Sequence, residues 1–152
     1  MKLNKVWLHK HSASPEGAGW MLAQKTSDPE KLLKAAIRDH RLGWANWGIV
    51  RLMNHKQQVQ YAIYAAEQVI DIYEKKYPKD DKPRKTIEAA KAFVKVPNEE
   101  NKNIAYAAYA ADAAAAAAAA AAYADADAAA AAMKIKILKY GLKLITKNGG
   151  TK

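Results

Sequence analysis

A run of Ala between residues 105 and 132 constrains the fold more than any other part of this sequence. Ala is the best helix former because fixing it in a helix costs no side-chain entropy. The acidic residues just before the run favour the positive end of a helix. We therefore predict one long helix from about Glu99 to Ala132, about 50 Å at 1.5 Å per residue. So narrow a helix lets its neighbours approach closely, and a second copy of the chain could supply them, which makes a homo-oligomer a reasonable expectation.

The same run raises the question of a membrane span, and the residues argue against one. Ala is only marginally hydrophobic, and three acidic residues would be costly in lipid; these are Asp112, Asp125 and Asp127. The N-terminal residues do not form a secretory signal, because basic residues soon interrupt any apolar run there. The chain has no Cys, which excludes disulfides and thiolate chemistry and suits a reducing cytoplasm.

Every other strong periodicity is also helical. Ser27-Asp28-Pro29-Glu30 has the capping residue, the proline and the acidic residue of a helix start. We expect Gly43 to break that helix and a second, short helix to follow to about Met53. Apolar residues from Gln57 to Tyr77 then repeat at alternating spacings of three and four, which predicts a longer helix. Pro78 ends it, and Pro83 opens the next one after a charged turn.

The two ends of the chain carry weaker patterns. Residues 134–147 show a helical stripe of apolar residues opposite lysines, although residues 133–137 also alternate as a strand would. We favour the helix. We expect residues 148–152 to fray. Residues 1–26 show no clean period and could form a loop, a short hairpin or an irregular arm. A chain of 152 residues is the size of one domain. The sequence therefore predicts a single all-α domain over 1–152, a compact bundle of five to six helices.

The formal net charge of +10 limits the kinds of partner that the chain suits. The positive excess lies toward both ends of the sequence, and the middle is nearly neutral. Such a bias attracts nucleic acid, an acidic protein or an anionic surface. The lysines at 136, 139, 143 and 147 could serve this purpose, but they also match an ordinary solvated helix face.

The most distinctive segment of the chain runs from Gly43 to Met53. Trp44 and Trp47 are three residues apart and share a helix face, with Asn46 and Arg51 on other faces. Trp and Arg are common anchors of protein interfaces, so these four residues are candidates for partner binding. The competing interpretation is that both Trp side chains belong to the core.

No arrangement of residues predicts catalysis, a metal site or a cofactor. A His-x-His pair at 9 and 11 is a weak zinc signal on its own. Asp125 and Asp127 point to different faces of a helix and do not form a two-carboxylate site. No phosphate loop or nucleophile motif is present. Around the charged turn, we expect Arg84 and Lys85 to form a local charge network with Asp80 and Asp81.

Residues 44–93 resemble a known family. The resemblance is carried by Asn46–Met53, Tyr61–Ile70, Tyr73–Pro78 and Asp80–Ala90, together with the Ala-rich helix beyond them. These segments are similar to the immunity proteins of bacterial polymorphic toxin systems, specifically the fifth-type immunity family, with similar sequences in phage genomes. The resemblance implies an all-α protein that is not an enzyme and that neutralises a toxin or a host defence factor by binding it.

Three functions follow for testing. The first is an immunity or counter-defence inhibitor that binds a protein partner through Trp44, Asn46, Trp47 and Arg51, extended by Arg84. A net charge of +10 suits an acidic target, since complementary potentials speed encounter. The second is a basic nucleic-acid-binding protein, whose affinity would fall as salt rises. The third is an enzyme with a site assembled from His40, Asn46 and Arg51, and no spacing rule supports it.

Overall fold

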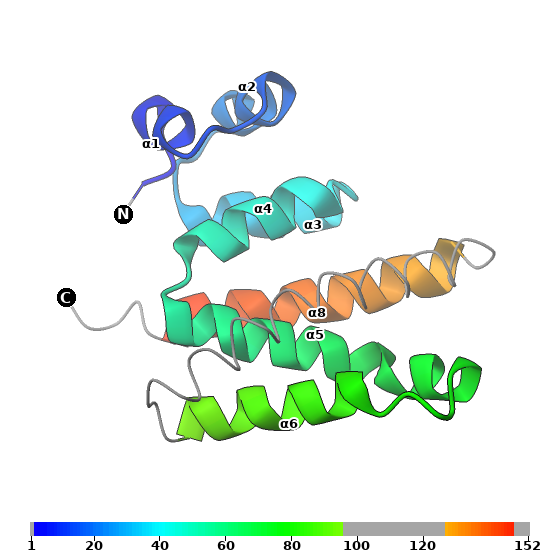
Figure 1. Cartoon of the computed structure of the whole chain (residues 1–152). Coiled ribbons are helices and arrows are strands. Elements are labelled where there is room, and N and C mark those ends of the chain that lie inside the picture. The colour runs from blue at the N-terminus through cyan, green and yellow to red at the C-terminus, as the bar shows by residue number, and fades with distance from the viewer. Residues whose placement is uncertain (1, 96–126, 148–152) are drawn as a thin grey trace. The chain divides into compact units, whose positions relative to one another are not determined.

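The computed structural model describes residues 2–95 and 127–147, and every regular element in these ranges is an α-helix (Figure 1). The all-α prediction is confirmed. The described residues fall into two compact units. Unit one contains residues 2–53 and 138–147, and unit two contains residues 54–95 and 127–137. A single domain over 1–152 stays a prediction.

Residues 2–26 contain two short helices, so the predicted loop, short hairpin or irregular arm is wrong. Helix α1 is Lys5–Lys10 and helix α2 is Pro15–Ala23. Each has a side-chain cap: Asn4 accepts a hydrogen bond from the amide of Trp7, and Ser14 accepts one from that of Gly17. Helices of six and nine residues are too short to show a repeating apolar stripe, which is why periodicity missed them.

Helices α3, Pro29–Arg38, and α4, Leu42–Leu52, follow in unit one. Asp28 caps α3 by accepting a hydrogen bond from the Lys31 amide at 2.9 Å. The prediction that Gly43 breaks the helix is wrong, because Gly43 lies inside α4. The chain turns three residues earlier instead, where His40 adopts a positive φ of 54° that ends the α3 region.

The core of unit one is built mainly from α3 and α4. Apolar side chains of α3 are spaced three and four residues apart and are fully or nearly fully buried. Gly48 of α4 allows the two helices to approach closely: a Cβ atom there would lie 2.7 Å from Cδ2 of Leu33. The buried apolar residues of this unit are Leu3, Leu8, Met21, Leu32, Leu33, Ala36, Ile37, Ala45, Ile49, Met53, Leu138 and Leu142.

Unit two contains a hairpin of two helices, α5, His55–Lys76, and α6, Lys82–Lys95. Both were predicted, and the turn between them lies where Pro78 and Pro83 placed it. A capping box starts α5: the Asn54 side chain accepts from the Gln57 amide, and the Gln57 side chain accepts from the Asn54 amide, each at 2.9 Å. Figure 1 shows the two helices side by side, with Val59, Ala66, Ile70, Ile87 and Ala90 in their small core.

Helix α8, Asp127–Lys147, is continuous, which confirms the helix in the tail over the alternating strand. It passes from unit two into unit one between Ile137 and Leu138. Most of the predicted Ala-rich helix and the predicted frayed tail at 148–152 lie outside the described residues. Within the described ranges, no helix has the length and apolarity that a membrane crossing requires.

Candidate functional site

All four Trp residues of the chain lie in unit one, where they form two pairs. Each pair joins one Trp of α4 to one Trp of an N-terminal helix. Trp47 meets Trp7 of α1 edge-on, with ring centroids 5.6 Å apart. Trp44 meets Trp20 of α2 at 5.9 Å. All four rings are half-buried, so Trp44 and Trp47 belong to neither the closed core nor a fully exposed face.

The pair around Trp47 is completed by Arg51 and His11. The Arg51 guanidinium lies over the Trp47 ring, 4.4 Å from its centroid, which is a cation–π distance. Its Nε donates a hydrogen bond to the carbonyl oxygen of His11 at 3.2 Å. The His11 ring stacks against Trp7 at 4.3 Å. Arg51 therefore ties α4 to the end of α1 and holds the Trp47 ring in place.

The pair around Trp44 has its own arginine, which the sequence analysis did not single out. The Arg41 guanidinium lies 4.5 Å from the centroid of Trp44 and 5.5 Å from that of Trp20. Arg41 precedes α4 but does not cap it with its side chain. Its side chain is exposed and has no hydrogen-bond acceptor among the described residues. A guanidinium stacked on a ring keeps its N–H edge available, so Arg41 can still donate to a ligand.

A groove with a volume of about 290 Å³ lies between α4 and the α1–α2 region. Trp44 and Trp47 line it together, so the structure brings the two predicted aromatic residues to one concave surface. At Gly17 the wall is tight, because a Cβ atom would lie 3.0 Å from Ser14 Oγ and 3.4 Å from Trp44 Nε1. At Gly43 it is open, with no atom within 4 Å of a Cβ. The other lining residues are Ser12, Ala13, Ser14 and Met21.

None of the other predicted site residues lines this groove, and Arg51 borders it only through the ring of Trp47. Asn46 is exposed on α4 and has interactions of its own, but it does not line the groove. Arg84 lies on α6 in unit two, whereas Trp44, Asn46, Trp47 and Arg51 are all in unit one. The structure thus groups the two Trp residues with Arg51, adds Arg41, and assigns Arg84 to a different environment.

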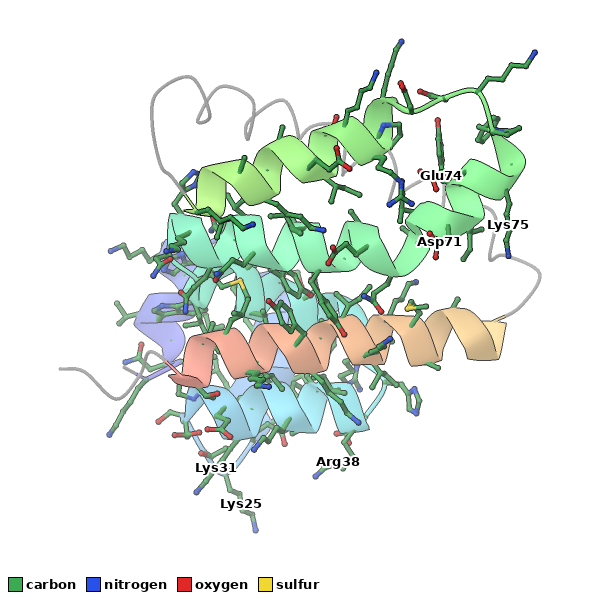
Figure 2. All side chains as sticks on the ribbon, turned by 90° about the horizontal axis from the view of Figure 1, so that it is seen from below. Lys25, Lys31, Arg38, Asp71, Glu74 and Lys75 are labelled. Carbon is green, nitrogen blue, oxygen red and sulfur yellow. The ribbon has the colours of Figure 1, made fainter. Side chains whose placement is uncertain are left out.

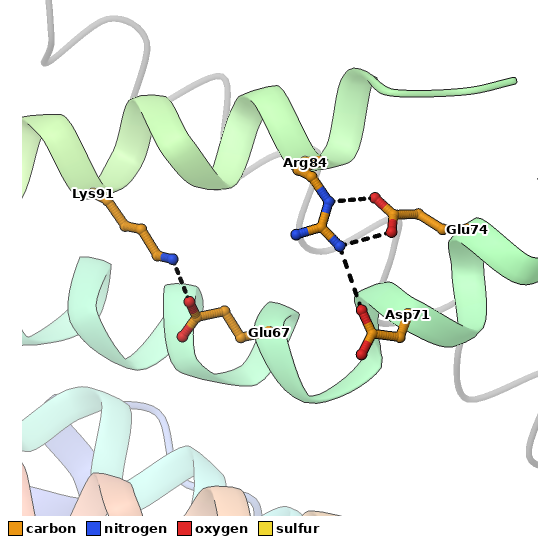
Figure 3. A network of polar contacts seen from close by, with 5 residues as sticks. All are labelled: Glu67, Asp71, Glu74, Arg84 and Lys91. Atoms are coloured by element: carbon orange, nitrogen blue, oxygen red, sulfur yellow. Dashed lines mark hydrogen bonds and ion pairs between the residues drawn. The ribbon is translucent and has the colours of Figure 1, made fainter. Parts of the chain in front are cut away.

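That environment is an ion-pair network between α5 and α6 (Figure 3). Arg84 donates to Glu74 through Nε at 2.5 Å and through Nη2 at 2.6 Å, and Nη2 also reaches Asp71 at 3.3 Å. Such a two-point pair matches the planar fork of a guanidinium. Further along the same two helices, Lys91 of α6 pairs with Glu67 of α5. The hydrogen bond from Arg84 lowers the pKa of Glu74 below its ordinary value.

The predicted charge network at the turn takes a different form from the one expected. Lys85 pairs with Asp81 at 2.7 Å, as predicted. Asp80 instead accepts a hydrogen bond from the Tyr73 hydroxyl at 2.8 Å and one from the Lys82 amide at 3.1 Å. These two bonds lower the pKa of Asp80, the Tyr73 bond most. Arg84 reaches back to α5 rather than to the turn.

Sequence reasoning missed Trp7, Trp20 and Arg41. A local signal for α2 was present: Ser14-Pro15-Glu16 repeats the start pattern that marked α3 as Asp28-Pro29-Glu30. It would have placed Trp20 on a helix. Nothing local relates Trp7 to Trp47, which are 40 residues apart, so only the tertiary fold reveals their contact.

In residues 2–95 and 127–147, no three His, Asp or Glu side chains converge as metal ligands would. No family model, curated protein or solved structure matches the chain. The resemblance to the fifth-type immunity family stays a prediction. The groove lined by Trp44 and Trp47 is the candidate functional site.

Proposed function

We propose that this chain is a non-enzymatic binding protein that engages a protein partner through the Trp-lined groove of unit one. Its role would be that of an immunity or counter-defence inhibitor, which neutralises the partner by occupying it. The single observation that supports this proposal is the convergence of Trp44 and Trp47 on one groove, each with an arginine over its ring. The Cys-free sequence is consistent with action in the cytoplasm.

The chemistry of the groove suits a protein surface better than a small substrate. Trp and Arg are the residue types that most often dominate the energy of protein interfaces. The groove, at about 290 Å³, lies at the lower end of the roughly 300–1,000 Å³ of small-molecule pockets. It has room for one or two side chains of a partner. Its lining contains two serines but no acid, base or metal ligand, so it offers no catalytic group.

The binding proposal can be tested by capture from a host lysate treated with nuclease. The bound protein is identified by mass spectrometry and then purified for titration against the chain. We expect a stoichiometric complex that resists nuclease and moderate salt. Trp47→Ala should weaken it by about tenfold or more, as loss of a central anchor does. Trp47→Phe should restore part of the affinity, because it keeps an aromatic ring against Trp7.

The matched control is Tyr77→Ala. Tyr77 is also a large aromatic residue, with 45% of its surface exposed, but it lies in unit two and outside the groove. Equal loss of affinity in Trp47→Ala and Tyr77→Ala would exclude the groove as the binding site. Recovery of nucleic acid alone, released by salt, would sink the protein-partner proposal itself.

A second candidate function, nucleic-acid binding, is favoured by one observation in α8. Lys136, Lys139 and Lys143 are exposed, follow one another at helical spacing, and make no ion pair with a described residue. Phosphate contacts make log K fall with log salt by roughly 0.7–0.9 per neutralised phosphate. Replacing the three lysines with Gln should flatten that slope; an unchanged slope would remove α8 from this function.

A further inference from the structure

Two arginines of unit one, Arg41 and Arg51, stack on the Trp rings that line the groove, and neither has a carboxylate partner among the described residues. Between residues 2 and 53 the sequence has nine Lys or Arg and four Asp or Glu. Three of the four acids are already engaged. Glu30 pairs with Lys34, Asp39 pairs with Arg38, and the Asp28 carboxylate caps α3. The fourth, Glu16, lies in the first turn of α2.

Arg41 and Arg51 are therefore cations without an ion pair among the described residues. Asp39 is close enough to Arg41 for that charge to contribute to its lowered pKa, but its hydrogen bond goes to Arg38. Arg51 uses one N–H on the His11 carbonyl and a longer bond of 3.4 Å on the Trp47 carbonyl. Each arginine stacks on a Trp that lines the groove, so both charges border the same apolar surface.

We infer that the groove holds an acidic segment of the protein partner, with one apolar or aromatic side chain between Trp44 and Trp47 and carboxylates at Arg41 and Arg51. The apolar lining accounts for the apolar or aromatic side chain of the partner, because aromatic rings gain most from burial against other rings. The unpaired guanidinium groups account for the acidic flanks, since Arg binds carboxylates through its N–H edge. This inference rests on the proposed function and specifies the chemistry of the partner.

A synthetic peptide tests the inference directly. Aspartate and glutamate flank a central phenylalanine in the probe, and Asn and Gln replace the acids in its neutral twin. Because all four Trp residues lie in the two pairs, intrinsic Trp fluorescence of the full chain reports on this site alone. We expect the acidic peptide to change that fluorescence saturably, and to bind about tenfold more tightly than its twin, as two exposed charge pairs would require.

Charge variants separate the groove from the general positive charge. Arg41→Gln combined with Arg51→Gln should weaken the acidic peptide by about tenfold. Lys25→Gln combined with Lys31→Gln removes the same net charge. Figure 2 shows these two lysines projecting outward from unit one, and unlike Arg41 and Arg51 they do not stack on a Trp ring of the groove. That control should change affinity by less than about twofold, the part due to net charge.

The indole N–H signals in an NMR spectrum provide a second readout that needs no variant. Those of Trp44 and Trp47 should shift on adding the acidic peptide. Equal binding of the neutral peptide would overturn the acidic preference and leave the proposed function intact. If no peptide has any effect while capture of the protein partner still depends on Trp47, the acidic preference is likewise overturned and the proposed function remains intact. Loss of both peptide binding and Trp47-dependent capture would overturn the inference and the proposed function together.

Discussion

Arg84 of unit two and the two Trp-stacked arginines of unit one use their guanidinium groups in different ways. In unit two, Arg84 is held by Glu74 and Asp71, so its donors are directed at its own fold. In unit one, Arg41 and Arg51 lie over Trp rings and meet no carboxylate among the described residues. The first arrangement joins two helices through ion pairs. The second leaves both guanidinium groups without a carboxylate, although Arg51 also joins α4 to the end of α1 through the His11 carbonyl. An arginine's partners, rather than its exposure alone, distinguish these two arrangements.

The two units also differ in how their helices are held together. Helices α3 and α4 are held by close packing, in which Gly48 of α4 lies against the fully buried Leu33 of α3. Helices α5 and α6 share a smaller apolar core and add ion pairs across their outer faces. Stability in unit one should therefore respond most to volume, and stability in unit two to caps, charge, salt and pH.

The largest effect is expected at Gly48. In Gly48→Ala the new methyl would lie 2.7 Å from Cδ2 of Leu33, which is fully buried and can shift only against other core atoms. Overpacking costs about 1–3 kcal/mol, which exceeds the gain of up to about 1 kcal/mol from Ala in a helix. Gly43→Ala in the same helix meets nothing within 4 Å and should be neutral or stabilising. Urea unfolding followed by Trp fluorescence should rank the two; the reverse order would contradict the packing argument.

The next effect concerns the start of α5. Asn54→Ala removes one side of the capping box and should lower the free energy of unfolding by about 1 kcal/mol. Lys56→Ala changes an exposed residue in the same turn and should have little effect. Circular dichroism during urea unfolding measures both. Equal stability of the two variants would show that α5 does not depend on its cap.

A smaller effect is expected at Arg84. Arg84→Gln should destabilise unit two slightly, and less in high salt, because the pair is partly exposed. The clearest sign of its contribution is the pH dependence of the free energy of unfolding. Arg84 lowers the folded-state pKa of Glu74 below the ordinary 4.5, so this contribution is present above that value and lost as pH falls through the lower folded value.

Unfolding free energies at neutral pH and in acid should therefore converge for the native chain and Arg84→Gln. Lys75→Gln, which removes the same charge from an exposed side chain with no ion pair among the described residues, is the control (Figure 2). A gap between native chain and Arg84→Gln that persists in acid would mean that the guanidinium acts by packing rather than by its charge.

The smallest effect is expected from Tyr73→Phe. The lost hydroxyl is the largest cause of the lowered pKa of Asp80, so that pKa should rise toward its ordinary 3.8 while global stability changes little. An NMR titration of the Asp80 carboxyl carbon measures the shift. An unchanged pKa would leave the Lys82 amide as the group that sets it.

Local rules were enough to predict the α5–α6 hairpin of unit two. The spacing of Val59, Ala66 and Ile70 identified α5, and the two prolines marked the turn. The partners of Arg84 were not predictable, because Glu74 and Asp71 precede it by 10 and 13 residues. Pairing over that distance depends on how α5 and α6 cross, and the stripe alone does not say which exposed side chains will face one another.

The site was predictable only in part. A helical spacing of three placed Trp44 and Trp47 on one face, as the structure has them. Trp7 and Trp20 reach that face from helices too short to carry a periodic pattern. Arg41 was overlooked because Gly43 was expected to end a helix, which would have separated it from Trp44. Once α4 is known to begin at Leu42, Arg41 and Trp44 are three residues apart and their stacking follows.

The open space at Gly43 has a consequence for how this protein could change over time. Residue 43 borders the groove, yet a side chain there would meet no neighbouring atom at its base. Substitutions at this position can therefore reshape the groove without disturbing the helix that carries it. Under the proposed function, a single substitution at residue 43 would change the surface offered to the partner while the fold of α4 stays as it is.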